Sequence, residues 1–444
     1  MTRTRIAAIV LISAIALLAA GLAGAGTSGK ASTSSSKVNL AVSGSVTFDG
    51  IWTAGEATAF GKVISAFNKV YPKVHINYKP VGNNVPTVLA TAIAGGRPPD
   101  MADIAQPGYI KQLAQQGHLK PITYARATMA ANFAPSWLQL GTFVGKLYAL
   151  PFKVSNKSLY WYNVPAFKTA GVKPPKTWAQ LTAAAKTLKA SGTPAYSLCG
   201  ASGWTLTDMF ENIYLRTFGL AKYNQLSAHK IKWTDASVTK ALKTMALVVG
   251  DSSNISGGSS GALQTDFPTC VTDAFGTPSK GAIVFEADFV AGAITSATKA
   301  KPGTDFNTAP FPAITPGPDA SAVEIGGDSL VTFRDTPAIR AFVKFLATAP
   351  AAAAWAKVGG FATGNHNLST AVYPNAIDKA NQTLVASAKA VVFDMSDEQP
   401  ASFGGTTGQG EWGLFQKFIQ APTNVSGIQK QLEAAAVAAY KKGK

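Results

Sequence analysis

The sequence predicts an α/β protein of two lobes, arranged as a clamp with several chain crossings between the lobes. With 444 residues the chain is too long for one ordinary domain, and it is 47% hydrophobic, which is sufficient for two cores. Strand and helix patterns alternate over residues 46–121. Extended segments near residues 145–152 and 304–314 then interrupt the lobes, which favours a clamp over a continuous barrel.

The first lobe is predicted from hydrophobic periodicity. Between Phe60 and Phe67, apolar residues recur at i, i+3, i+4 and i+7, which indicates one buried helix face. Val74, Ile76 and Tyr78 alternate with polar residues and indicate a half-buried strand. A second helix at 88–96, a strand within 98–105 and a third helix at 109–117 complete the alternating pattern.

The second lobe is predicted to begin at the crossing near residue 152. Thr177 and Gln180 have capping-box spacing before a helix that continues to residue 190. An amphipathic helix is expected over 204–218, a buried strand over 281–288, and a return crossing over 304–314. A strand at 329–333, a helix at 336–347 and a mostly helical remainder follow. The predicted lobes are 38–151 with 305–348, and 152–304 with 349–444.

The N-terminus has the pattern of an export signal. Arg3 and Arg5 precede an apolar run over 6–22, and Ala23-Gly24-Ala25 is a small-x-small cleavage site. Residues 1–25 are therefore expected to be a signal peptide, or an anchor if they remain uncleaved, since the run could just span a bilayer. Residues 26–37 are expected to be a flexible linker.

The chain is strongly basic, with a net charge of +17. No run of basic residues exceeds Lys441-Lys442 and no basic stripe interleaves with aromatic residues, so no nucleic-acid partner is expected. Attraction to anionic lipid or wall polymers is one interpretation of the charge, and solubility is the simpler one.

Cysteine and histidine usage limits the possible covalent and metal chemistry. Cys199 and Cys270 suggest one disulfide in an oxidising compartment, closing a loop of about 70 residues, and two free buried thiols are the alternative. The four histidines lack metal-ligand spacing, so neither a metal nor a cofactor is expected.

Several motifs resemble a known family. They include Gly-Gly-Arg-Pro-Pro-Asp at 95–100, Gly-Lys-Leu-Tyr-Ala-Leu-Pro at 145–151, and Gly-Gly-Phe-Ala-Thr-Gly-Asn at 359–365. In order and spacing the chain resembles the family 1 extracellular solute-binding proteins of ABC transporters, the carbohydrate receptors related to maltose-binding protein. Residues 203–208 and 393–400, with Trp412, resemble the α-glucoside branch.

The resemblance implies a periplasmic-binding-protein type II clamp, a monomer that binds an oligosaccharide and delivers it to a membrane permease. One departure concerns anchoring, because the first cysteine is Cys199 and no lipobox cysteine follows the signal. The protein is therefore expected to be exported, either to a periplasm or to the outer face of the cell membrane. There it would be secreted or held by an uncleaved signal helix.

A sugar site needs aromatic rings for the apolar sugar faces and forked polar side chains for the hydroxyls. It is expected between the lobes, where closure buries the ligand. The candidate ligand-binding residues are Trp52, Glu56, Asp103, Gln106, Lys153, Asn156, Trp204, Asp208, Asp288, Gly327, Asp328, Phe361 and Trp412.

Each candidate has a structural alternative. Trp52 and Glu56 follow the first predicted strand, at the end where α/β sheets bind ligands, but Trp52 could be core. Asp103 and Gln106 follow the third strand, where Asp103 could simply cap a helix. Lys153 and Asn156 lie on the crossing, and a solvated hinge is their alternative.

The remaining candidates come from the second lobe and the return crossing. Trp204 and Asp208 are one helical turn apart and form the preferred second-lobe pair. Glu286 and Asp288 alternate on one strand end, so only one of them can face the cleft, and Asp288 is the favoured one. Residues 326–328 resemble a ligand-side turn, although a plain turn would look the same. Phe361 would line the pocket and Trp412 would cover the sugar, unless it is helix core.

Three other functions compete with a sugar receptor. A glycosidase would need two carboxylates about 5 to 9.5 Å apart, and Asp208 with Glu211 is the nearest pair in the sequence. Their neighbours resemble receptor elements, so no enzyme is expected. A polyamine or ferric-iron receptor is disfavoured because acids are few and aromatics are many. A wall-adhesion module is the third alternative.

Overall fold

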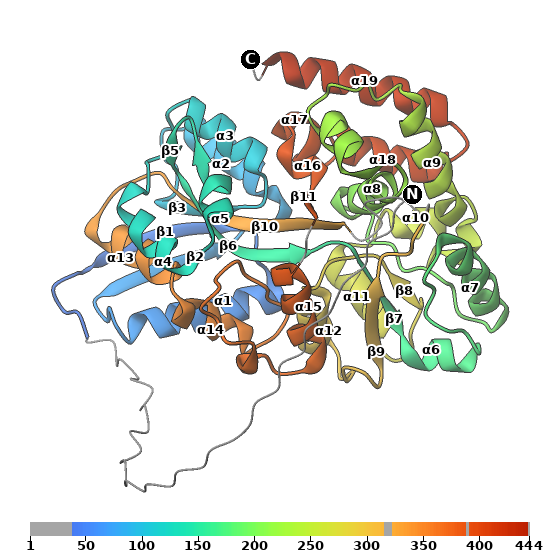
Figure 1. Cartoon of the computed structure of the whole chain (residues 1–444), viewed down its shortest axis with the longest axis horizontal. Coiled ribbons are helices and arrows are strands. Elements are labelled where there is room, and N and C mark those ends of the chain that lie inside the picture. The colour runs from blue at the N-terminus through green and yellow to red at the C-terminus, as the bar shows by residue number, and fades with distance from the viewer. Residues whose placement is uncertain (1–37, 315–321, 388–389, 443–444) are drawn as a thin grey trace, which may run out of the picture. The chain divides into compact units, whose positions relative to one another are not determined.

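The computed structural model describes residues 38–314, 322–387 and 390–442 (Figure 1). The predicted signal peptide and linker, residues 1–37, lie outside the described residues. Residues 38–444 form one compact unit. Within the described part of the chain, every helix is too short or too polar to cross a membrane.

The first sheet contains six strands in the order β11-β10-β3-β1-β2, with β6 also paired to β10. β1, β2 and β3 are parallel to one another, whereas β10 is antiparallel to both β3 and β6. A three-stranded sheet has the order β8-β7-β9, and β4 and β5 form a hairpin. The strands are β1 (Gly44–Gly50), β2 (Val74–Pro80), β3 (Met101–Ile104), β4 (Thr142–Phe143), β5 (Lys146–Leu147), β6 (Ala149–Asn156), β7 (Leu159–Asn163), β8 (Ile283–Val284), β9 (Phe306–Pro310), β10 (Val323–Thr332) and β11 (Val391–Phe393).

Helices surround both sheets (Figure 1). Those of the N-terminal half are α1 (Ala54–Asn68), η1 (Gly82–Asn84), α2 (Val85–Ala94), α3 (Pro107–Gln115), η2 (Thr123–Ala125), α4 (Arg126–Asn132), α5 (Pro135–Leu140), α6 (Val164–Thr169), α7 (Trp178–Ala190) and α8 (Trp204–Ser227). The others are α9 (Ala236–Val249), η3 (Ser252–Asn254), α10 (Gly258–Ala262), α11 (Phe267–Phe275), α12 (Val290–Ala297), α13 (Pro337–Leu346), α14 (Ala349–Ala356), η4 (Thr370–Val372), α15 (Ala376–Ser387), α16 (Met395–Glu398), α17 (Ala401–Gly404), α18 (Gly410–Gln420) and α19 (Val425–Lys442).

Two large hydrophobic cores underlie the fold. The first gathers Trp52, Phe60, Phe152, Phe342 and Trp355 around the six-stranded sheet. The second core lies among the helices of the other half, and its aromatic members include Phe210, Tyr214, Trp233, Phe285, Phe403 and Phe415. The predicted α/β clamp of two lobes is confirmed. The exact lobe boundaries stay a prediction, and Trp355 and Phe361, which that prediction assigns to the second lobe, pack in the first core.

Local sequence signals account for several element ends. The Thr177 hydroxyl accepts from the Gln180 amide and the Gln180 side chain returns the bond, so the predicted capping box is confirmed. The helix expected over 204–218 is present, but helical structure extends beyond its predicted end. Gly219, with φ of 76°, interrupts α8, and helical structure then continues to Ser227.

The strand predicted over 281–288 is shorter in the structure, where only Ile283 and Val284 pair with β7. The cause lies in Trp161 of β7, whose indole N–H donates to the carbonyls of Glu286 (3.1 Å) and Ala287 (2.9 Å). A side chain thus takes the acceptors that a longer ladder would use. Cys199, which precedes α8, and Cys270 of α11 are joined in a disulfide, the first of the two predicted alternatives.

Candidate functional site

A cavity of about 340 Å³ opens between elements of both cores. Its walls come from the start of α1, η1, the end of β6, β10, and the first turns of α8, α11 and α16. Eight of the thirteen candidate residues line it: Trp52, Glu56, Gln106, Lys153, Trp204, Gly327, Asp328 and Trp412.

Lys153 organises one side of the cavity. Its ammonium lies 2.8 Å from the Glu56 carboxylate and 3.5 Å from that of Asp328. The Trp52 indole N–H donates to Asp328 at 2.6 Å. Burial by itself lowers the pKa of Lys153, but the carboxylates of Glu56 and Asp328 outweigh it and raise this pKa above its ordinary value. The lysine is therefore a fixed cation beside two carboxylates.

The pairing of β6 with β10 sets the direction of these side chains. Asp328 pairs with Lys153 and Ser329 with Pro151, so the register shifts by one residue at this point. Such bulges re-aim side chains and are common beside functional sites. At Gly327 an added Cβ would lie 2.5 Å from the Lys153 carbonyl oxygen, so only glycine fits there.

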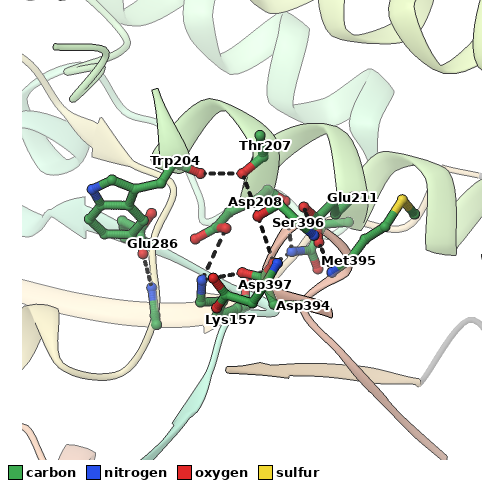
Figure 2. Close-up of polar contacts among 12 residues, drawn as sticks. Lys157, Trp204, Thr207, Asp208, Glu211, Glu286, Asp394, Met395, Ser396 and Asp397 are labelled. Atoms are coloured by element: carbon green, nitrogen blue, oxygen red, sulfur yellow. Dashed lines mark hydrogen bonds and ion pairs between the residues drawn. The ribbon is translucent and has the colours of Figure 1, made fainter. Parts of the chain in front are cut away.

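Lys157 organises the part of the cavity wall next to α8 and α16, and Figure 2 shows its contacts. Its ammonium lies 3.1 Å from Asp208 and also contacts Asp394. Asp394 accepts further bonds from the Ser396 hydroxyl (2.8 Å) and the Asp397 amide (2.9 Å). Burial tends to raise the pKa of Asp394, but Lys157 and these donors hold it below its ordinary value.

Other buried acids stand behind Lys157. Glu211 accepts from the amides of Met395 (2.5 Å) and Ser396 (3.1 Å), and it thereby fixes the start of α16 (Figure 2). Carboxylate oxygens of Asp208, Glu211 and Asp394 lie within 4.8 Å of one another, which is close enough to share a cation. The Lys157 ammonium contacts two of these acids and supplies that positive charge.

Burial shifts the protonation of this cluster. It raises the pKa of Asp208 and of Glu211 well above the ordinary range, and it raises that of Glu286 to about 7. Lys157 opposes the shift in all three. The wall at this side therefore combines the Asp394–Lys157 pair, which lines the cavity, with more deeply placed acids whose pKa values are raised by burial.

Aromatic rings supply the apolar surface of the cavity. The half-buried Trp204 ring lies 5.7 Å from that of Phe267 and 6.2 Å from that of Phe289. Lys157 lies 5.5 Å from the Trp204 ring. Trp412 also lines the cavity but is only 3% exposed. Trp204, Phe267 and Phe289 are thus the rings arranged to face a ligand.

Trp52 does not present its ring to the cavity, although its position after the first strand suggested that the ring would stack on a sugar. Its side chain is 1% exposed and packs between Phe60 (4.6 Å) and Trp355 (4.9 Å) in the first core. It reaches the cavity edge and orients Asp328 through the indole N–H. The core alternative that the sequence left open therefore describes most of this side chain.

Five candidates are not among the lining residues, and each contacts a segment behind the cavity. Asp103 accepts from the Ile51 amide at 2.7 Å, which positions the loop after β1. Asp288 accepts from the Asn156 amide at 3.1 Å, and Asn156 in turn closes a local turn with Ser158. Asp208 holds Lys157, and Phe361 stacks on Trp355 with ring centroids 5.3 Å apart.

Further lining residues that the sequence did not single out include Asn83, Lys157, Ser202, Asp266, Phe267, Phe289, Asp394, Ser396 and Asp397. Most lie in short turns at the starts of helices, where single-sequence periodicity carries no signal. The Asn83 amide donates to the Ser202 hydroxyl at 3.1 Å and so joins the two sides of the cavity. Only residues 393–400 offered a signal, through the motif resemblance.

A cavity between two cores, with aromatic walls and fixed charged groups, defines a receptor for a small polar solute. The family profile of the bacterial extracellular solute-binding proteins matches residues 52–353. The chain belongs to this family, and the predicted membership is confirmed.

Individual relatives and solved structures show which members of the family the chain is similar to. It is 30% identical over 377 residues to the alpha-glucosides-binding periplasmic protein AglE of Rhizobium meliloti (strain 1021), covering 81% of this chain and 80% of that protein. It is 28% identical to the osmoprotective compounds-binding protein GgtB of Synechocystis sp. (strain ATCC 27184 / PCC 6803 / Kazusa), covering 72% and 76%. Among solved structures, the bacterial solute receptor AcbH, described as preferring β-D-galactopyranose, shares the fold. Its TM-score is 0.78 at 20% identity, over 89% of this chain and 99% of that one.

Proposed function

We propose that this protein is an extracytoplasmic carbohydrate receptor of an ABC importer and that its ligand is an α-linked glucoside. The observation that carries the proposal is the pairing of half-buried aromatic rings at Trp204 and Phe289 with fixed hydrogen-bonding groups at Glu56 and Asp394 in one cavity. The similarity to an α-glucoside-binding protein over four-fifths of the chain supports the linkage class.

The chemistry of the cavity suits a sugar. The C–H faces of a pyranose would stack on Trp204, and its hydroxyls would donate to carboxylates whose own orientation is already fixed by lysine. Because Lys153 and Lys157 pre-orient these acceptors, a ligand would lose little free energy in ordering them. Lobe closure and transfer to a membrane permease, by a monomer outside the cytoplasm, complete the proposal.

Titration calorimetry on residues 38–444 tests the proposal, because this segment contains every described hydrophobic core. The panel is maltose, maltotriose, trehalose, sucrose, cellobiose, xylobiose, spermidine and ferric citrate. We expect binding of an α-linked glucoside and much weaker binding of cellobiose. Binding of spermidine or iron alone would reject the sugar proposal. Steady release of glucose from maltotriose would reject a pure receptor.

Trp204→Ala is the matching residue test. We expect it to weaken glucoside binding by about 1–3 kcal/mol, since it removes the half-buried ring that lines the cavity. Trp178→Ala in the second core is the control, because this tryptophan is 5% exposed and is not among the lining residues. It should lower the melting temperature without changing affinity at temperatures where the protein stays folded. Equal affinity for Trp204→Ala and the parent would place the ligand elsewhere.

A further inference from the structure

Acidic and basic side chains are distributed very unequally between the interior and the surface. Of the 23 acids in the sequence, eleven are buried in the described part of the chain, against two lysines and one arginine. The buried acids are Asp103, Asp208, Glu211, Glu286, Asp288, Glu324, Asp328, Asp378, Asp394, Asp397 and Glu411. The protein surface is therefore more basic than the net charge of +17 alone suggests.

Four exposed lysines lie together on a surface formed by α7 and α9. Neither helix contains an acidic residue, and their four lysines, Lys186 and Lys189 on α7 with Lys240 and Lys243 on α9, are exposed. Leu247 of α9 is 62% exposed. One surface hollow is bordered by Lys186, Lys189 and Leu247, and a second by Lys240, Lys243 and Leu247. We call this continuous surface the α7–α9 face.

The lysines of the α7–α9 face are poorly neutralised. Lys189 lies 3.5 Å from Asp251, and this ion pair is about half exposed, so it contributes little. Among the described residues, no carboxylate lies within ion-pair distance of Lys186, Lys240 or Lys243. Lys240 and its neighbour Lys222 instead lie over the ring of Phe218, at 5.8 and 5.3 Å.

We propose that the α7–α9 face docks on an anionic phospholipid bilayer. Lysines surrounding an exposed apolar side chain are the arrangement that binds at a lipid interface, where the cations meet headgroups and the apolar group meets the acyl boundary. A soluble polyanion would attract the lysines but leave Leu247 in water, so lipid fits the face better. In Figure 1, α7 and α9 lie on the far side of the second lobe from β6 and β10. Docking there leaves the cavity free.

Vesicle co-sedimentation tests the proposal on residues 38–444. The vesicles contain phosphatidylcholine with either 0 or 40 mol% phosphatidylglycerol. The test variant is K186A/K189A/K240A/K243A, and its charge-matched control is K62A/K69A/K111A/K344A, which removes four exposed lysines of the first lobe. We expect the test variant to lose on the order of a hundredfold in partitioning to anionic vesicles, and the control less than about tenfold.

Leu247→Ser separates lipid docking from attraction to any polyanion. It should weaken binding to the anionic vesicles several-fold while leaving retention on immobilised heparin unchanged. Equal losses in the test and control variants would show attraction by net charge alone and overturn the proposal. Binding to heparin or teichoic acid without binding to vesicles would also overturn it. Each variant must keep the parent's melting temperature and glucoside affinity, because none of these residues lines the cavity.

Discussion

At the scale of single residues, the site depends on two buried lysines, Lys153 and Lys157, whose charges are compensated by carboxylates. Lys157 is 9% exposed and its partners Asp208 and Asp394 are buried. Removing one partner of such a group leaves the others buried and uncompensated, which costs more than the ion pair itself is worth. Lys189 with Asp251 offers a natural comparison, because it is an exposed pair in the same lobe.

Lys157→Met should lower the free energy of unfolding by about 3–5 kcal/mol, because it leaves the buried charge of Asp394 without its cation. Lys189→Met should change it by less than about 1 kcal/mol. Urea unfolding followed by tryptophan fluorescence measures both. Similar small losses in the two variants would contradict the role given to Lys157.

The sequence allowed prediction of many residues near the cavity but not of their individual roles. Glu56 and Trp204 lie in the first turns of helices and Lys153 lies on β6, and topology brings these positions to the cavity edge. Whether a side chain then faces the ligand depends on partners distant in sequence, as Trp52 shows by bonding to Asp328, 276 residues away. Asp394 and Ser396 were missed because they belong to a turn without periodicity.

At the scale of elements, helix starts bring the cavity residues together. α8 begins directly after Gly203, whose φ is 91° and whose Cα faces Trp412 of α18. An added Cβ would lie 2.7 Å from both the Cβ and the carbonyl oxygen of Trp412. The same glycine therefore provides a backbone conformation and a close contact between the two segments that carry Trp204 and Trp412.

Gly203→Ala should destabilise the protein and weaken glucoside binding several-fold, because α8 must move away from Trp412. Gly192→Ala is the matched control, since Gly192 has a φ of 92° with no atom within 4 Å of an added Cβ. It should show the backbone strain alone, about 1–3 kcal/mol in unfolding, with unchanged affinity. Calorimetric binding and urea unfolding of both variants separate the two effects.

Element types could be predicted from periodicity more reliably than element lengths. The helix from Thr177 and the strand through Ile76 follow local patterns, and both are present. The strand expected over 281–288 is limited to two residues because a distant indole N–H binds its carbonyls. That contact joins residues far apart in the sequence, so no local pattern predicts it.

At the scale of the whole molecule, buried acids couple stability to pH. Burial raises the folded-state pKa of Glu286 to about 7, against an ordinary value of 4.5. Between about pH 5 and 7 the folded protein keeps a proton that the unfolded chain has lost. Stability due to this group is therefore greatest at low pH, falls as pH rises through that window, and levels off above pH 7.

Glu286→Gln should flatten this fall by up to about 1.4 kcal/mol per pH unit between pH 5 and 7, and leave the slope above pH 8 unchanged. Asp288→Asn should act in the same window, since burial also raises the pKa of Asp288 to about 7. Urea unfolding at half-unit pH steps provides the slopes. Curves parallel to that of the parent would contradict the assignment.

The disulfide contributes at the same scale. Cys199 and Cys270 are separated by 71 residues, and a bond closing such a loop restricts the unfolded chain by about 4 kcal/mol in the chain-entropy treatment. The double variant C199S/C270S should lose a comparable free energy of unfolding. The reduced parent protein should unfold at the same urea concentration as the variant. A parent unaffected by reductant would contradict this contribution.

Strand β6 has a consequence for how such a receptor can diversify. All eight of its residues are buried, it pairs with β10, and it carries Lys153, with Lys157 immediately beyond it. A substitution there alters the core, the pairing and the cavity at once, so few substitutions are tolerated. New ligand preferences are therefore more accessible through Asn83 and Asn84 of the turn at 82–84, which line the same cavity and are half-buried or exposed. A designer seeking a new specificity would hold β6 constant and vary that turn.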